Sequence, residues 1–121
     1  MLIPDSAARL WPSPVVERGD QGFIVGYSTD GVCRVVRFAG ELDLLTRDLA
    51  NRACLDGDHI AVVVDLAETT FMDCCGYGGL VAARLVLEQR GGSLTVRNQT
   101  GQPARVLARI GEECPTLACA S

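Results

Sequence analysis

Apolar residues follow two periods along the chain, the short unbroken runs of β-strands and the four-residue spacing of amphipathic helices. The strongest run, Ile-Ala-Val-Val-Val-Asp-Leu at residues 60–66, has no polar alternation. Such a run indicates a strand at the centre of a parallel sheet, buried on both faces. Weaker runs predict strands over residues 23–28, 32–39 and 93–96, and a last edge strand over residues 115–118.

Three segments between these strands have helical spacing. We expect helices over residues 44–55, 76–89 and 102–110. The first should bury Leu45, Leu49 and Ala53, and the second Leu80, Ala83 and Leu87. Residues 67–75, between the strongest strand and the second helix, are expected to be a loop.

This order of elements predicts one α/β domain. Residues 23–28 and 32–39 flank a Thr-Asp-Gly turn and should form a hairpin, whereas the later strands alternate with helices and should be joined by parallel crossovers. We expect a mixed β-sheet of four to five strands, with an N-terminal hairpin strand and three to four helices. Residues 1–20 contain three prolines around Trp11 and should be an extended or partly disordered lead-in to a domain over residues 21–121.

Composition excludes several kinds of chemistry. The chain has 121 residues, and its 11 basic side chains are all arginine. Without lysine there is neither a Schiff-base nucleophile nor a phosphate-loop lysine, and His59 alone gives little basis for a catalytic triad or a multi-histidine metal site. We therefore expect no enzyme activity and no cofactor.

Charge and hydropathy limit the partners. The net charge is −4 and the arginines are dispersed, which disfavours nucleic acid. No stretch approaches the roughly 20 apolar residues of a membrane span, and the N-terminus lacks the features of a secretory signal. The expected location is the cytoplasm, without membrane insertion.

Six cysteines need a reason other than stability, since a chain of this length buries enough surface without disulfides. Cys33 and Cys54 are expected in the core, Cys74 and Cys75 are adjacent, and Cys114 and Cys119 lie five apart. No CxxC pair exists, which argues against a zinc ribbon or a thioredoxin-type centre. In the cytoplasm these thiols are reduced by default, so that any disulfide would be conditional.

Four short motifs follow one another along the chain between residues 40 and 98. They are GELD at residues 40–43, VVDL at 63–66, TFMDCCG at 70–76, and RGG at 90–92 with VRN at 96–98. In order and spacing, residues 22–118 resemble the STAS domain of bacterial anti-sigma factor antagonists. The resemblance implies a non-enzymatic switch that binds a serine-kinase-like anti-sigma factor and releases a sigma factor. In this family, phosphorylation of a serine beside the loop aspartate turns the switch off.

This chain departs from the family at the regulatory position. The resemblance places the phosphorylated serine at Cys74, and Cys75 takes the place of the next Ser or Ala. It implies that the partner contacts Glu41, Asp43, Asp73, Cys74, Cys75, Gly76 and Tyr77, with Tyr77 either an interface anchor or a core residue. Because a thiol is not a normal kinase substrate, three outcomes stay open: constitutive activity, control by oxidation, or loss of the kinase-linked pathway.

The two readings of Cys74 are a steric replacement of serine and a redox sensor. A bond between the adjacent Cys74 and Cys75 would be strained, so a disulfide from Cys74 to a third cysteine is expected if one forms. Cys119 is preferred over Cys114 because it should lie on the same rim of a parallel sheet. A metal site made from these four cysteines is disfavoured, because adjacent ligands fit a tetrahedron poorly.

Alternatives to an anti-sigma factor antagonist remain. The second hypothesis is a STAS accessory subunit of a lipid or anion transport complex, which would bind an ATPase or permease partner. A third, a cysteine-based redox enzyme, is weakened by the absence of CxxC. The glycines at positions 76, 78 and 79 are better explained by close helix packing than by a nucleotide site, since no phosphate-binding motif surrounds them.

Overall fold

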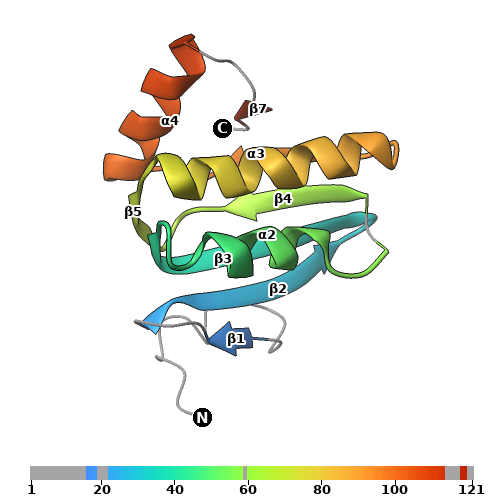
Figure 1. The fold of residues 1–121 in the computed structure, drawn as a ribbon. Helices are drawn as coiled ribbons and strands as arrows, with labels where there is room; N and C mark the ends of the chain where they lie inside the picture. The colour runs from blue at the N-terminus through green and yellow to red at the C-terminus, as the bar shows by residue number, and fades with distance from the viewer. Residues whose placement is uncertain (1–15, 19–21, 59, 114–117, 120–121) are drawn as a thin grey trace.

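The structure is a computed structural model that describes residues 16–18, 22–58, 60–113 and 118–119 (Figure 1). Its strands are β1 (Val16–Arg18), β2 (Ile24–Asp30), β3 (Cys33–Leu42), β4 (Ala61–Asp65), β5 (Thr69–Met72), β6 (Ser93–Arg97) and β7 (Ala118–Cys119). Its helices are α2 (Arg47–Leu55), α3 (Cys74–Gln89) and α4 (Gly101–Glu113).

The strands form one mixed sheet in the order β1-β2-β3-β4-β6-β7, and β5, off this path, pairs with β3. Strands β1, β2 and β3 are antiparallel, whereas β3, β4, β6 and β7 run parallel. The predicted α/β fold, the hairpin strand and the central position of β4 are confirmed. Val62 and Val64 of β4, which share one face, are fully buried, whereas Ala61 and Val63 on the opposite face are half-buried, so the predicted burial of both faces is confirmed for one face only.

Helices α2 and α3 pack on each other over one face of the sheet, whereas α4 packs against β5 at the end of the sheet (Figure 1). The predicted buried face of α3, Leu80, Ala83 and Leu87, is confirmed. Cys54 lies in the core as expected, but Cys33 is only half-buried. The predicted burial of Leu45 is wrong. Residues 44–46 form a turn before α2, and this turn leaves the Leu45 side chain 60% exposed.

The segment 67–75, expected to be a loop, contains β5 and the first two residues of α3. Strand β5 forms because β3 continues to Leu42, and Leu42 pairs with Met72. Helix α3 begins at Cys74 because Asp73 is its N-cap. The expected lead-in contains β1, and its other residues lie outside the described part of the chain. Of the expected last strand, residue 118 lies in β7, while residues 115–117 lie outside the described part.

A buried carboxylate fastens the carboxyl end of the sheet. Asp65, 2% exposed, stands in register with Arg37 on β3 and Arg97 on β6. Its Oδ2 lies 3.2 and 3.5 Å from the Nε atoms of Arg37 and Arg97. The Oδ1 atom accepts from Ala67 N at 3.0 Å, and Oδ2 also accepts from Asn98 Nδ2 at 3.1 Å. These contacts compensate the burial of the charge and hold the turn that leads into β5.

The start of α3 lies against the end of β3 at Gly76. A Cβ added at Gly76 would fall 2.1 Å from the Leu42 carbonyl oxygen, far inside van der Waals contact. Only glycine therefore fits this approach. Gly78, one half-turn further along the helix, faces open space, because nothing lies within 4 Å of the corresponding Cβ.

This difference predicts opposite effects of one substitution. We expect Gly76→Ala to lower the free energy of unfolding by about 1–3 kcal/mol, because the methyl group forces α3 away from β3. The matched Gly78→Ala should be neutral or stabilising by up to about 1 kcal/mol, because alanine is the better helix former. Urea unfolding of the two variants measures both effects, and equal effects would contradict the close approach at Gly76.

Candidate functional site

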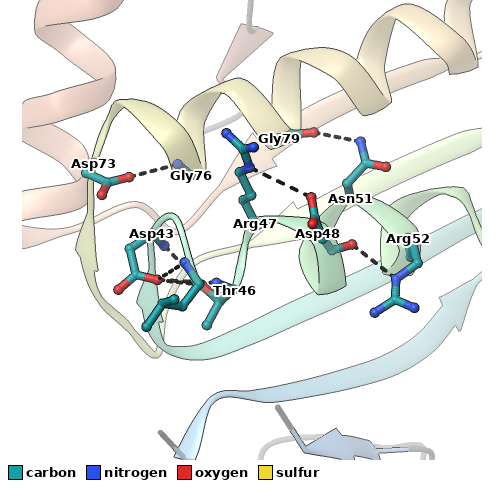
Figure 2. A network of polar contacts seen from close by, with 10 residues as sticks. Asp43, Thr46, Arg47, Asp48, Asn51, Arg52, Asp73, Gly76 and Gly79 are labelled. Atoms are coloured by element: carbon teal, nitrogen blue, oxygen red, sulfur yellow. Dashed lines mark hydrogen bonds and ion pairs between the residues drawn. The ribbon is translucent and has the colours of Figure 1, made fainter. Parts of the chain in front are cut away.

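A rigid turn follows the end of β3. The Asp43 carbonyl accepts from Arg47 N at 2.9 Å, and its Oδ1 accepts from Leu45 N at 3.0 Å. Thr46 is buried, and its Oγ1 donates to the Glu41 carbonyl at 2.7 Å while accepting from Asp43 N at 3.0 Å. Figure 2 shows how these bonds join Asp43 and Thr46. The Asp43 side chain is thus held by the backbone that it helps to fold.

A second fixed carboxylate precedes α3. Asp73 N donates to the Leu42 carbonyl at 3.3 Å. Asp73 Oδ1 accepts from Gly76 N at 2.9 Å, as Figure 2 shows. This is the N-cap bond of the helix, and the positive end of the helix dipole stabilises the carboxylate there. Cys74 and Cys75 then occupy the first two helical positions. Cys74 is exposed and Cys75 is half-buried.

The pairing of Leu42 with Met72 brings these two segments to one end of the sheet. Glu41 and Cys74 are exposed there, and Asp43 and Asp73 are half-buried. We call this set, Glu41, Asp43, Asp73 and Cys74, the acidic rim. Gly76 and Tyr77, expected among the contact residues, are buried, and Tyr77 packs in the core with 8% of its surface exposed. Of the two readings of Tyr77, the structure therefore supports the core residue.

Large apolar side chains at the same end of the sheet were missed by the sequence analysis. Leu44 and Leu45, in the turn after Asp43, are 58% and 60% exposed, and Phe71 on β5 is 39% exposed. Exposed leucines and phenylalanine next to fixed carboxylates are typical of a surface that binds a protein. The signal in the sequence was the position of the leucine pair directly after GELD, before helical spacing begins.

A groove of about 400 Å³ lies between α2 and α3. It is lined by Arg47, Asp48, Asn51, Gly78, Gly79 and Ala82. Asn51 Nδ2 donates to the Gly79 carbonyl at 3.0 Å and joins the two helices below the groove (Figure 2). The predicted role of the glycines in close packing is confirmed for Gly76 and for Gly79, where a Cβ would lie 3.1 Å from the Arg47 carbonyl oxygen, and is wrong for Gly78, which faces open space.

The described cysteines lie in contrasting surroundings. Burial raises the pKa of the Cys54 thiol to about 12, and the nearby Arg34 charge offsets this only in part. Cys54 is therefore protonated and inert in the folded protein, whereas Cys74 faces solvent. Within the described ranges, no cluster of three or more His, Cys, Asp or Glu could hold a metal ion.

The strand register separates Cys119 from Cys74. Strand β7 runs parallel to β6, as expected, and Cys119 stands beside Val96, in the row of Val64 and Val36. Met72 pairs with Leu42, six residues further along β3, which corresponds to about 20 Å at the rise of a β-strand. A disulfide needs Cα atoms within about 7 Å. A bond between Cys119 and Cys74 thus requires β7 to leave the sheet. Cys114 lies outside the described residues.

Comparison with protein-family models identifies the family of this chain. A family model described as "Mlab, STAS domain" matches residues 25–113, which is most of the chain. The chain belongs to the STAS family. The match includes both segments of the acidic rim. No curated protein matches this STAS chain.

Solved structures share the fold at low sequence identity. An anti-sigma factor antagonist from Mycobacterium paratuberculosis has a TM-score of 0.70 and 20% identity, over 85% of this chain and 89% of that chain. The unphosphorylated anti-sigma factor antagonist SpoIIAA, a Bacillus cell fate determinant, has a TM-score of 0.56 and 20% identity, over 82% and 87%. The murine anion transporter Slc26a9 gives 0.60 and 14%, over 88% of this chain but 20% of its own.

These likenesses establish the STAS fold. Helices α2, α3 and α4 are all too short or too polar to cross a membrane, and the same holds for every helix in the described residues. The rim itself consists of fixed carboxylates, exposed apolar side chains and one exposed thiol. Such a combination of groups is suited to contact with a protein partner.

The contrast between Cys54 and Cys74 predicts selective thiol chemistry. At pH 8 we expect a maleimide to modify Cys74 in the folded protein and to leave Cys54 unmodified until the chain unfolds. Peptide mass spectrometry with and without urea measures both sites. The Cys74→Ser variant is the control for assignment. Modification of Cys54 at the rate of Cys74 under native conditions would contradict the burial described above.

Proposed function

We propose that this STAS protein is an anti-sigma factor antagonist, which binds a serine-kinase-like anti-sigma factor in the cytoplasm and thereby releases a sigma factor. The observation that carries the proposal is the acidic rim, formed where the Asp43 turn and the Asp73-capped start of α3 meet. Both carboxylates are fixed by backbone donors, so that little side-chain freedom is lost when a partner binds.

The rim favours a partner with complementary chemistry. The bonds described within the protein use Oδ1 of both Asp43 and Asp73, and the second oxygen of each is a candidate acceptor for a donor of the partner. Leu44, Leu45 and Phe71 add exposed apolar surface at this end of the sheet. The anti-sigma factor should therefore present basic side chains next to an apolar patch.

Cys74 changes the regulation of such a complex. A phosphoserine at this position would bring about −1.5 to −2 charges beside Asp73, and its bulk together with its repulsion of the Asp73 carboxylate would disrupt the fitted contacts with the partner. The thiol of Cys74 does not accept phosphate from a serine kinase. The kinase-like partner should then bind this protein without switching it off.

Control by oxidation is the second part of the proposal. A peroxide transfers one oxygen atom to the exposed Cys74 sulfur, the O–O bond breaks and water leaves, so that the thiol becomes a sulfenic acid. The product is larger and more polar than the thiol and lies in the rim. A later disulfide to Cys75, Cys114 or Cys119 would release a second water molecule, and a bond to Cys119 would in addition displace β7.

A transport role is the alternative candidate. The matching family model bears the description Mlab, and one structural likeness is to a domain of an anion transporter. A thiol at the phosphoserine position suits a STAS subunit that binds an ATPase or permease partner without phosphorylation. The same rim would serve as the contact surface. A gene neighbourhood of ATPase and permease genes, rather than a kinase-like anti-sigma gene, favours this alternative.

The first test uses a kinase-like anti-sigma factor from the same organism. Calorimetry should detect binding of the reduced wild-type protein, and added ATP should transfer no phosphate to it. Cys74→Ser should accept phosphate and lose affinity. Asp73→Asn keeps a capping oxygen but removes the charge, so its affinity should fall by up to about fivefold with little loss of stability. Failure of the reduced wild type to bind would overturn the proposed function.

The second test concerns oxidation and is made without ATP. After treatment with hydrogen peroxide, we expect the wild-type protein to bind the anti-sigma factor at least fivefold more weakly, with full recovery in reductant. Cys74→Ala, which is neither oxidised at this position nor phosphorylated, should bind equally before and after treatment. Mass spectrometry reports the state of Cys74. Unchanged affinity of a protein fully oxidised at Cys74 would refute redox control.

A further inference from the structure

A side chain of α4 bonds both polar groups of the Met72 backbone. Met72 N donates to Gln102 Oε1 at 2.8 Å, and Gln102 Nε2 donates to the Met72 carbonyl at 2.8 Å. The Gln102 carboxamide thus makes the two bonds that the peptide group of a neighbouring strand would make. Met72 itself is fully buried, and the amide is partly buried with it.

The bonds from Gln102 stabilise β5 on the side that faces away from β3. Among the described strands, β5 pairs with β3 only, and the register shifts between Gly40 and Glu41. Toward β3, Asp73 N, the next backbone donor after Met72, donates to the Leu42 carbonyl. The Met72 groups are bonded from the other side, by Gln102. The backbone just before the N-cap is therefore held between β3 and α4.

The held segment leads directly into the acidic rim. Met72 precedes Asp73, whose extended backbone (φ −118°, ψ −175°) carries the capping carboxylate and then Cys74. A shift of the Met72 peptide moves Asp73 with it, because only one covalent link separates them. Helix α4 contributes no residue to the rim, but it packs against β5 directly behind this segment (Figure 1).

We propose that Gln102 is a positioning residue for partner binding, which holds Met72 and thereby keeps Asp73 and Cys74 in the geometry that the partner recognises. The inference rests on the proposed function and adds α4 to the elements that determine affinity. Gln102 itself does not touch the partner. Its effect passes through the Met72 backbone.

The experiment compares three variants of the full chain. Gln102→Leu keeps a side chain of similar size and helix preference but removes both bonds. Gln102→Glu keeps an acceptor for Met72 N and loses the donor to the Met72 carbonyl. Gln89→Leu, at the exposed end of α3, is the matched control for the loss of an amide. Each variant is measured by thermal unfolding, by hydrogen exchange of single amides, by maleimide labelling of Cys74 and by affinity for the same anti-sigma factor.

For Gln102→Leu we expect exchange at Met72 and Asp73 to accelerate at least tenfold, with less than a twofold change at Val62 and Val64 in the folded protein. Cys74 labelling should change at least twofold, and affinity should fall about tenfold. Gln102→Glu should lie between this variant and wild type, and Gln89→Leu should match wild type. A merely structural role would lower the melting temperature and leave the affinity of the folded protein and the local exchange pattern unchanged.

The outcomes separate the two proposals. If Gln102→Leu is folded and keeps wild-type exchange at Met72 and wild-type affinity, the positioning role is wrong. If the wild type does not bind the anti-sigma factor, the proposed function fails, while exchange and Cys74 labelling still decide whether Gln102 holds the segment. If Gln102→Leu does not fold, Gln102→Glu decides, and wild-type values for it in all four measurements would overturn the proposal.

Discussion

The contact on which the site depends is the approach of α3 to the end of β3 at Gly76, where a Cβ would lie 2.1 Å from the Leu42 carbonyl oxygen. Because the first turn of α3 touches the backbone of β3, the carbonyl of Leu42 also lies within reach of Asp73 N. The positions of the Asp73 cap, the Cys74 thiol and the turn after β3 are therefore coupled to one another. A side chain at residue 76 would separate them all.

The sequence predicted those elements whose secondary structure follows from their own pattern of apolar residues. Strand β4 is recognised by its unbroken apolar run, and α3 is recognised by the spacing of Leu80, Ala83 and Leu87. Neither pattern depends on which elements the segment contacts. Strand β5 escaped prediction because Thr69–Met72 is short and its extended state depends on pairing with β3 and on the Gln102 amide, 30 residues away. Leu45 was misplaced because helical spacing does not reveal that Asp43 and Thr46 close a turn first.

The candidate site was predicted in its segments and not in its side-chain directions. The motifs indicated that residues 40–43 and 70–76 belong together, and the pairing of Leu42 with Met72 brings them together. Which of the residues 74–77 face outward depends on where the helix begins. A start at Cys74, two residues before the expected one, turns Tyr77 into the core and leaves Cys74 exposed. The N-cap bond that fixes this start is a three-dimensional feature.

The way the rim is held limits how it can be switched. Its backbone is fixed from three directions, by the Leu42 carbonyl, by the cap to Gly76 N and by Gln102. The Cys74 side chain projects from this frame and takes no part in it, because the contacts use the backbone and the Asp73 carboxylate. A modification of the Cys74 sulfur would therefore change the charge and shape of the surface without unfolding the segment. By contrast, a change at α4 would shift the backbone around Met72 and Asp73 and leave the exposed side chains of the rim chemically unchanged. The proposed docking surface thus has two physically separate points of control, one at the Cys74 thiol and one through α4.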